Sequence, residues 1–270
     1  MDKKIGFIGC GNMGQAMLKG MINSNLFKPE LLIASTTVRS FIKLQEKFNI
    51  NIVTNNLEVA DFADIIILSV KPEKFKSIID EIKSHVKNTT VIVSIAGGIK
   101  VKQIENMFGV NTKIVRAMPN TSAVVRESMS VLCKNEFVLE EELNTVLSIF
   151  NSFGKTQLIE EKLIDAVASV SGSSPAYVYM FIEAMADASV IRGIPRDEAY
   201  KLAAQAVLGA AKMVLETGQH PAILKDNVCS PGGTTIEGVY SLEKNNFRGT
   251  IIEAMEKCTE KTIKLAKGEY

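Results

Sequence analysis

The clearest structural signal lies near the N-terminus, in the stretch Lys3-Lys4-Ile5-Gly6-Phe7-Ile8-Gly9-Cys10-Gly11-Asn12-Met13-Gly14-Gln15-Ala16-Met17. Its apolar run Ile5–Ile8 predicts a first strand, and the apolar periodicity of Met17–Ile22 predicts a helix. Between the two, Gly9, Gly11 and Gly14 match the pattern G-x-G-x-x-G. Glycine-rich turns are common, but this one joins a strand to a helix, which indicates a dinucleotide-binding turn.

The three glycines of this turn have separate tasks. Gly9 allows the tight turn, Gly11 lets the backbone approach a pyrophosphate, and Gly14 lets the helix pack closely against the strand. We therefore expect the backbone between Gly9 and Gly14 to hold the phosphates of a dinucleotide.

The residues after the second predicted strand, Leu31–Ala34, bear on the choice of cofactor. A site selective for NAD usually places Asp or Glu about 20 residues past the glycines, whereas here the sequence runs Ser35-Thr36-Thr37-Val38-Arg39. Hydroxyl groups followed by arginine suit a 2′-phosphate, because the guanidinium group presents several donors to phosphate oxygens. The sequence therefore favours NADPH, although NADH use stays open and Arg39 could equally lie solvated at the start of the next helix.

A second glycine-rich turn lies near the C-terminus, in Leu224-Lys225-Asp226-Asn227-Val228-Cys229-Ser230-Pro231-Gly232-Gly233-Thr234-Thr235. Thr234 and Glu237 have the spacing of a capping box, which predicts a helix starting at Thr235. The free N–H groups of its first turn and the helix dipole favour an anion, and Gly232 and Gly233 leave room for a small ligand. An ordinary Pro-Gly turn is the alternative, but a dinucleotide motif in the same chain favours a ligand site.

Composition excludes several classes of function. The chain has 270 residues, enough for two modest domains, and its net charge of +1 with no basic block argues against nucleic-acid binding. Two histidines make a three-histidine metal site impossible. The N-terminal apolar run is broken by glycines, unlike a signal peptide, and Leu202–Leu215 is too short to span a bilayer.

The cysteines indicate the compartment. They are scattered, with no C-x-x-C pair, at Cys10, Cys133, Cys229 and Cys258. Such spacing is typical of reduced thiols, so we expect a cytoplasmic protein.

Strand and helix patterns alternate along the first part of the chain, which predicts a parallel, doubly wound sheet. The expected strands are Ile5–Ile8, Leu31–Ala34, Ile65–Val70, Val91–Ile95, Ile114–Ala117, Met129–Leu132 and Thr156–Leu158. Ligands of such sheets lie outside the carboxyl ends of the strands. Three loops fall there, and in two of them we expect Pro72 to fix the turn after Lys71 and Pro119 to hold Met118 and Asn120 against the nicotinamide half.

From about Leu163 onward the pattern becomes helical, which sets a domain boundary between residues 162 and 163. Ala176–Ile191 and Arg196–Leu215 are predicted as long helices, the second bounded by Pro195 and Gly218. This second helix has almost no polar face, so it must be buried all round. We expect a second copy of the chain to cover it in a homodimer; a central helix of a monomeric bundle is the alternative.

Several segments together carry a family resemblance. They are the Gly9–Gly14 turn, Ser69-Val70-Lys71-Pro72, Ala96-Gly97-Gly98, Arg116-Ala117-Met118-Pro119-Asn120-Thr121, Ser171-Gly172-Ser173-Ser174-Pro175-Ala176-Tyr177, and the run from Gly218-Gln219-His220-Pro221 to Gly232-Gly233-Thr234-Thr235. Over essentially its whole length the chain resembles the pyrroline-5-carboxylate reductases. The resemblance implies an N-terminal Rossmann domain, an all-α dimerisation domain, and NAD(P)H-dependent reduction of 1-pyrroline-5-carboxylate to L-proline, the last step of proline biosynthesis. Family members often assemble dimers into larger rings.

The resemblance also implies the site residues. The expected cofactor-binding residues are Gly9, Gly11, Asn12, Met13, Gly14, Ser35, Thr36, Arg39, Asn56, Val70, Lys71, Pro72, Ala96, Gly97, Met118 and Pro119. The expected substrate-binding residues are Ser230, Gly232, Gly233, Thr234, Thr235, Met118 and Asn120, and no metal site is expected. Thr235 is the expected catalytic residue, with its hydroxyl on the ring nitrogen and Thr234 at the capping position.

The implied chemistry is hydride transfer from the nicotinamide to the imine carbon, for which orientation is the protein's main task. We expect the N–H groups of Gly233, Thr234 and Thr235, with the Ser230 hydroxyl, to hold the substrate carboxylate while the nicotinamide faces the ring from the other lobe. A threonine hydroxyl is a poor acid, so a positioning role for Thr235 is favoured over proton donation. The alternatives are a 3-hydroxyacid dehydrogenase, whose catalytic lysine motif is replaced here by Ser171–Pro175, and a non-catalytic dinucleotide-sensing module.

Overall fold

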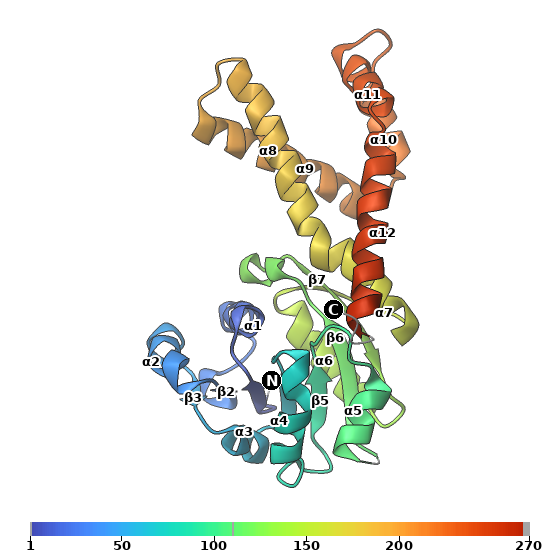
Figure 1. The fold of residues 1–270 in the computed structure, drawn as a ribbon. Helices are drawn as coiled ribbons and strands as arrows, with labels where there is room; N and C mark the ends of the chain where they lie inside the picture. The colour runs from blue at the N-terminus through green and yellow to red at the C-terminus, as the bar shows by residue number, and fades with distance from the viewer. Residues whose placement is uncertain (1, 110, 267–270) are drawn as a thin grey trace. The chain divides into compact units, whose positions relative to one another are not determined.

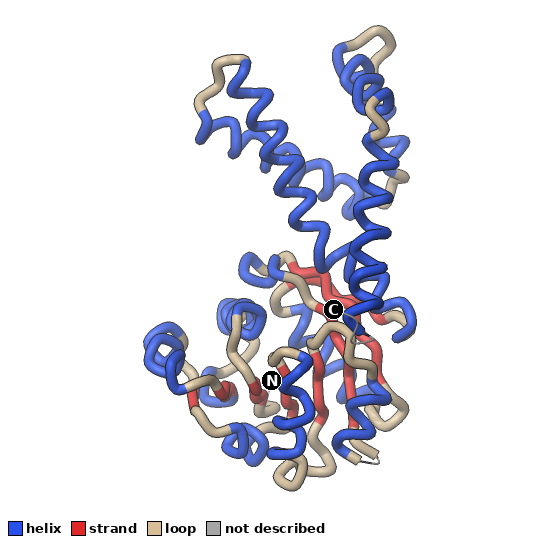
Figure 2. Tube along the Cα trace, viewed as in Figure 1, coloured by secondary structure: helices blue, strands red, loops and turns tan. Residues whose placement is uncertain are grey.

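The structure is a computed structural model that describes residues 2–109 and 111–266. The chain divides into two compact units, unit 1 (residues up to Gly172, with the chain from Thr259 onward) and unit 2 (Ser173–Cys258). Unit 1 contains a sheet covered by helices, and unit 2 is helical (Figures 1 and 2). The predicted fold class, a Rossmann-type sheet followed by an all-α region, is confirmed.

Unit 1 is built on a sheet whose described strands run in the order β3-β2-β1-β4-β5-β6-β7-β8. The strands are β1 (Ile5–Ile8), β2 (Leu32–Ser35), β3 (Asn51–Val53), β4 (Ile65–Leu68), β5 (Val91–Ser94), β6 (Lys113–Met118), β7 (Ser128–Lys134) and β8 (Gly154–Leu158). From β3 to β6 all neighbours pair in parallel. These six strands have the strand order of the doubly wound dinucleotide-binding fold.

The predicted parallel sheet has one exception among the described strands, because β7 runs antiparallel to β6. The connection between them is a short 3₁₀ segment, η3 (Thr121–Val125), followed by Arg126 in the left-handed conformation with φ 63°. A parallel return would need a crossover of about a dozen residues or more. The connection is too short for one, so the chain turns straight back along the sheet.

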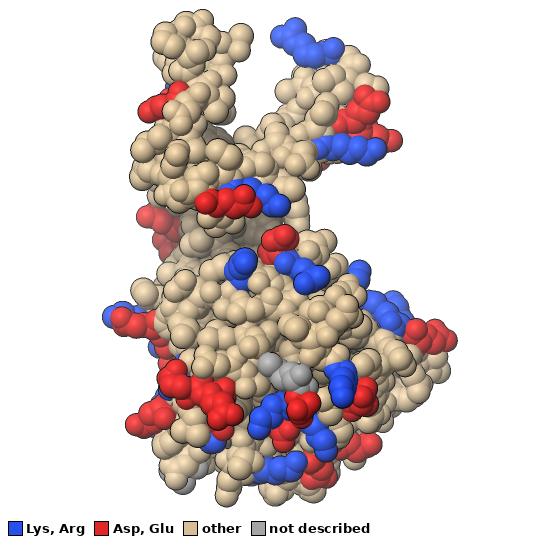
Figure 3. Space-filling view, turned by 180° about the vertical axis from the view of Figure 1, so that it is seen from behind, with Lys and Arg blue, Asp and Glu red and all other residues tan. Residues whose placement is uncertain are grey.

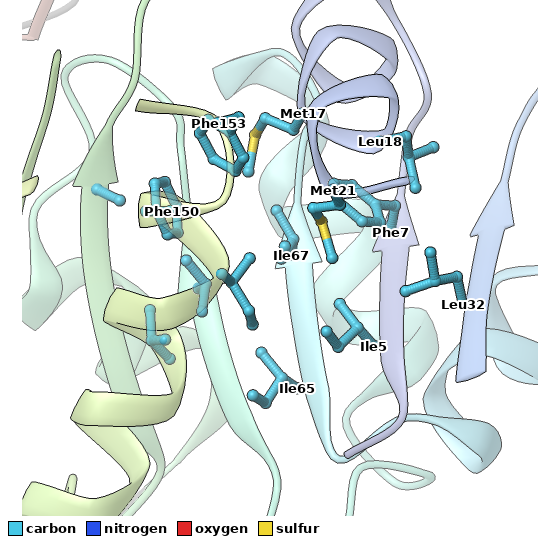
Figure 4. Packing of buried hydrophobic residues seen from close by; sticks show 14 of the residues in the cluster. Ile5, Phe7, Met17, Leu18, Met21, Leu32, Ile65, Ile67, Phe150 and Phe153 are labelled. Atoms are coloured by element: carbon cyan, nitrogen blue, oxygen red, sulfur yellow. The ribbon is translucent and has the colours of Figure 1, made fainter. Parts of the chain in front are cut away.

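Helices cover both faces of this sheet (Figure 1). They are α1 (Asn12–Asn23), α2 (Val38–Lys47), α3 (Asn56–Phe62), α4 (Phe75–Ile82), α5 (Val101–Phe108), α6 (Glu140–Asn151) and α7 (Glu161–Val167), with 3₁₀ turns η1 (Pro29–Leu31) and η2 (Pro72–Lys74). Figure 4 shows Met17 and Met21 of α1 packed with Phe7, Phe150 and Phe153, in a core where the last two rings lie 5.3 Å apart between centroids. This packing fixes α1, and with it the glycine turn, against β1.

Unit 2 consists of long helices. A π-helical segment, η4 (Ala168–Ser173), leads into unit 2, which contains α8 (Ser174–Ile191), α9 (Arg196–Thr217), α10 (Pro221–Val228) and α11 (Thr234–Lys244). Helix α12 (Phe247–Ala266) belongs to unit 2 as far as Cys258 and to unit 1 from Thr259. The predicted start of α9 at Arg196 and its stop at Gly218, which caps it with φ 64°, are confirmed, although the helix runs two residues past the predicted Leu215, to Thr217. No described helix is long and apolar enough to cross a membrane.

Candidate active site

The Gly9–Gly14 turn has the geometry that each glycine was predicted to supply. Gly9 has φ +87°, and a Cβ atom there would lie 2.6 Å from the Ser69 carbonyl oxygen, so only glycine fits. At Gly14 a Cβ would lie 3.0 Å from the Gly9 carbonyl oxygen, which shows how closely α1 approaches the turn. Both positions are therefore fixed by packing inside unit 1.

Gly11 differs from its neighbours because it faces open space. It is the N-cap of α1 and is exposed, and a Cβ there would meet nothing within 4 Å. Asn12 and Met13 follow it in the first helical turn, whose N–H groups have no intrahelical partner and carry the positive end of the helix dipole. An open backbone at such a helix start fits a pyrophosphate.

The side chain of Gln15, which the sequence did not single out, holds this turn through hydrogen bonds. Gln15 donates from Nε2 to the Cys10 carbonyl oxygen at 3.1 Å, and its Oε1 accepts a hydrogen bond from Lys47 Nζ at 2.7 Å. Lys47 is the last residue of α2. Gln15 thus connects the peptide between Gly9 and Gly11 to a second helix. This role depends on the long-range contact with Lys47, which a single sequence does not reveal.

At the carboxyl end of β2 the predicted residues have unequal positions. Ser35 is 2% exposed and donates to Asn56 Oδ1 at 2.7 Å, so it positions Asn56 instead of presenting its own hydroxyl. Asn56 also donates to Glu81 at 2.9 Å, and Thr36 is partly exposed. Arg39 lies in the first turn of α2, exposed, and makes no ion pair with any described carboxylate. Its guanidinium group is therefore available to an external anion.

Two further predicted loops follow β4 and β5 at the same edge of the sheet. After β4, Val70 is partly exposed, Lys71 is exposed, and Pro72 starts the turn η2. After β5, Ala96 is buried, whereas Gly97 is exposed and has nothing within 4 Å of a built Cβ. Because carboxyl ends of parallel strands share one edge of a sheet, these loops lie at the same edge as the Gly9–Gly14 turn.

The loop after β6 is the most enclosed of the predicted segments. Met118 is partly exposed, Pro119 is buried, and Asn120 is 7% exposed. The Asn120 backbone N–H donates to Ser128 Oγ at 3.2 Å, and its side-chain Nδ2 donates to the Ser171 carbonyl oxygen at 2.8 Å. Asn120 Oδ1 has no hydrogen-bond partner among the described residues.

Arg116, two residues before Met118, is buried in strand β6. Its guanidinium group pairs with Glu161 at 3.3 Å and Asp165 at 2.7 Å, both on α7, and Glu161 also accepts a hydrogen bond from the Val101 N–H at 2.7 Å. This network ties β6 to the helix that precedes η4. The sequence signal was an arginine within an apolar strand, which implies a buried partner but does not identify it.

The second glycine-rich turn lies in unit 2 and differs from its prediction in one respect. Helix α11 starts at Thr234, not Thr235, and its N-cap is Gly233, with no side-chain capping bond. The predicted capping role of Thr234 is wrong, because Gly232, with φ +66°, turns the chain one residue earlier than the capping-box spacing implied. Thr234 and Thr235 are therefore the first two helical residues, the former exposed and the latter partly exposed.

The same turn shows which groups are free to bind an anion. The Gly233 N–H donates to the Ser230 carbonyl oxygen at 3.0 Å, so it is not the free donor that the sequence predicted. A Cβ at Gly233 would lie 2.4 Å from Ser230 Oγ, which means that the serine hydroxyl rests directly on the glycine. The first free N–H groups are those of Thr234 and Thr235, beside this hydroxyl.

Two further features of the described residues bear on the site: the distribution of charge and the grouping of possible metal ligands. On the face of unit 1 seen in Figure 3, acidic and basic side chains are interspersed, without a large patch of one sign. Among the described residues, no three His, Cys, Asp or Glu side chains are grouped as a metal would require.

The fold, the G-x-G-x-x-G turn and the strand-end loops define a dinucleotide-dependent oxidoreductase. Residues 4–98 match a family model described as NADP oxidoreductase, coenzyme F420-dependent. Residues 161–265 match the model for pyrroline-5-carboxylate reductase dimerisation.

Relatives are similar along the whole chain. The pyrroline-5-carboxylate reductase of Escherichia coli is 51% identical over 99% of this chain and 100% of its own, and that of Methanosarcina acetivorans is 41% identical over 98% and 99%. A Plasmodium falciparum pyrroline carboxylate reductase, solved with NADP bound, is 37% identical, with a TM-score of 0.89 over 98% of each chain. The chain belongs to the pyrroline-5-carboxylate reductase family.

Proposed function

We propose that this chain is an NAD(P)H-dependent reductase that converts 1-pyrroline-5-carboxylate to L-proline, the last step of proline biosynthesis. One observation carries the proposal: in a chain 51% identical to such an enzyme, the turn before α11 combines an open glycine, Gly232, with a serine hydroxyl and free helix N–H groups. A small ring with one carboxylate and one nitrogen needs such a combination.

Each group of the turn has a definite task in this proposal. The N–H groups of Thr234 and Thr235 and the hydroxyl of Ser230 hold the carboxylate, with Gly232 leaving room for the ring. The Thr235 hydroxyl hydrogen-bonds the ring nitrogen and so orients the C=N bond. When bound, the reduced nicotinamide cofactor supplies the hydride.

The residue assignment is tested by Thr235→Val, which keeps the side-chain shape and removes the hydroxyl. We expect kcat for proline formation to fall by roughly 10²-fold, since orientation of the nitrogen is lost. The Kd of NADPH, measured by fluorescence titration, should stay within about twofold, because helix α11 is intact. Thr250→Val, which removes a hydroxyl from α12 in the same unit, is the matched control. An unchanged kcat in Thr235→Val would remove Thr235 from the site.

For the cofactor we propose NADPH as the preferred reductant. The Plasmodium falciparum relative was solved with NADP, and here an unpaired Arg39 follows hydroxyl residues after β2. Arg39→Ala should weaken NADPH binding by about 10-fold, the worth of a charge-assisted hydrogen bond, and NADH binding by less than twofold. Lys43→Ala, an exposed cation on the same helix, is the control. Equal losses for the two cofactors would exclude Arg39 from a 2′-phosphate site.

We further propose a cytoplasmic homodimer formed through the helices of the C-terminal half. The dimerisation model matches from residue 161, close to the expected boundary between residues 162 and 163, whereas the compact units divide between Gly172 and Ser173. Many large apolar side chains of α8 and α9 are exposed in the single chain, including Met180, Leu202 and Leu215.

An assay of pyrroline-5-carboxylate-dependent oxidation of NADPH and NADH separates this enzyme from a non-catalytic sensing module.

A further inference from the structure

The side-chain amide of Asn120 has a hydrogen-bond partner for its NH₂ group but none for its oxygen. Its Nδ2 donates to the Ser171 carbonyl oxygen at 2.8 Å, whereas Oδ1 has no partner among the described residues, although Asn120 is only 7% exposed. The amide cannot be reversed, because Ser171 presents an acceptor that needs the NH₂ group. A buried acceptor without a donor is costly and rare, so this oxygen requires an explanation.

Asn120 is also firmly held in place. Its N–H donates to Ser128 Oγ at 3.2 Å, and that hydroxyl lies 3.2 Å from Ser130 Oγ, both serines being buried on β7. The Ser171 carbonyl belongs to the π-helical segment η4. The loop after β6 is thus fixed on two sides, and the direction of Oδ1 is set before any ligand arrives.

The place of Asn120 in the sheet indicates the missing donor. The described strands run in the order β3-β2-β1-β4-β5-β6. A dinucleotide on such a sheet would cross the switch point between β1 and β4, with its two halves on opposite sides of that point. Arg39 follows β2 on the adenosine side, whereas Asn120 follows β6 on the nicotinamide side. The hydrogen-bond donor that the nicotinamide ring system carries is its carboxamide NH₂ group.

We propose that Asn120 Oδ1 accepts a hydrogen bond from the carboxamide NH₂ of the nicotinamide, which makes Asn120 a positioning residue for the cofactor. The sequence placed Asn120 beside the nicotinamide half and among the substrate-binding residues, and the unpaired acceptor favours a direct contact with the cofactor. By holding the carboxamide, Asn120 fixes which face of the ring is turned to the substrate. The proposal rests on the proposed use of a nicotinamide cofactor.

The test is a two-by-two comparison of protein and cofactor. Wild type and Asn120→Ala are titrated with NADPH and with its reduced 3-acetylpyridine analogue, which keeps the carbonyl but lacks the NH₂ group. We expect Asn120→Ala to weaken NADPH by about 5- to 10-fold, the range for one hydrogen bond. For the analogue the two proteins should agree within about twofold, because its acetyl group offers Oδ1 no donor.

Two more variants separate this role from a structural one. Ser130→Ala removes a neighbouring buried hydroxyl of the same network, and we expect it to shift both cofactors equally. Asn120→Ser keeps a polar group in the buried position and serves if Asn120→Ala fails to fold. Equal weakening of both cofactors by either Asn120 variant, or a change confined to the KM of the pyrroline substrate, would overturn the proposal.

Binding constants need no turnover, so the two proposals fail separately. Absence of pyrroline-5-carboxylate reduction with the coupling preserved would contradict the proposed reaction only. Normal reduction with no coupling between Asn120 and the NH₂ group would contradict the assignment of Asn120 only.

Discussion

Cys10 lies inside the glycine turn, and its burial affects the dependence of stability on pH. Burial raises the pKa of its thiol from 9.0 to about 11, an effect that nearby Lys47 partly opposes. The folded chain therefore keeps a proton that the unfolded chain loses above about pH 9. The stabilisation that comes from the protonated Cys10 thiol is fully present below about pH 9 and is lost as the pH rises towards 11.

Cys10→Ala tests this dependence. At about pH 10.5 the wild type should have lost about 2 kcal/mol of unfolding free energy at this residue, a loss that the variant cannot show. Urea unfolding at pH 8 and pH 10.5 gives the change in unfolding free energy of each protein. Groups other than Cys10 titrate alike in both proteins, so their effect cancels when the two changes are subtracted. Cys133→Ala should behave alike, because burial also raises the pKa of that thiol to about 11. A pH-independent difference between wild type and variant would refute the expectation.

Residue roles could be predicted where backbone geometry alone sets them. The tasks of Gly9 and Gly14 follow from the motif, and the structure confirms both. The capping role of Thr234 was wrong, since spacing alone does not reveal that Gly232 turns the chain earlier. Partners such as Ser35 with Asn56 are distant in sequence, so their pairing had no sequence signal.

At the scale of elements, the glycine turn depends on α2 as well as on α1. Gln15 holds the Cys10 carbonyl, and Lys47 at the end of α2 holds Gln15. Losing this brace frees the peptide between Gly9 and Gly11, so ordering it on binding costs more conformational entropy. The brace therefore stabilises the bound conformation of the turn in advance.

Gln15→Ala should consequently weaken NADPH binding by about 3- to 5-fold, the effect of losing one or two partly exposed hydrogen bonds. Since Gln15 does not belong to the substrate turn, kcat at saturating NADPH should change less than the Kd. Fluorescence titration and steady-state kinetics measure the two quantities. Gln103→Ala, which removes a comparable amide at the start of α5, is the control. A lower kcat with an unchanged Kd would contradict the brace.

Most elements were predictable because apolar runs mark strands that are buried on both faces. β1 and β4 are fully buried, and the predicted ranges coincide with them or extend one or two residues beyond. β3 was missed, since it has only three residues and starts with exposed Asn51 at the edge of the sheet. Strand direction was missed at β7 because it depends on the length of a turn and not on hydropathy.

For the whole molecule, the sequence located both glycine-rich turns but not the contacts that hold them. The apolar residues of α9 indicated burial by a partner, and the structure leaves Leu202, Leu208 and Leu215 of this helix exposed in unit 2. α8 and α9 pack against each other, with the small side chains of Ala186, Ala199 and Ala203 buried. The large apolar side chains of α9 named above are exposed instead of lying between α8 and α9. An exposed apolar surface of this kind is typical of a protein–protein interface.

Leu208→Arg tests the proposed dimer, because a charge buried in an apolar interface without a partner is strongly destabilising. Light scattering after gel filtration should give at least twice the chain mass of 29.5 kDa for the wild type and the single-chain mass for the variant. Leu26→Arg changes an exposed leucine of unit 1 in the same way and should leave the mass unchanged. If Leu208→Arg kept the wild-type mass, the interface would lie elsewhere on the helices; if the wild type itself had the single-chain mass, the exposed leucines would need another partner.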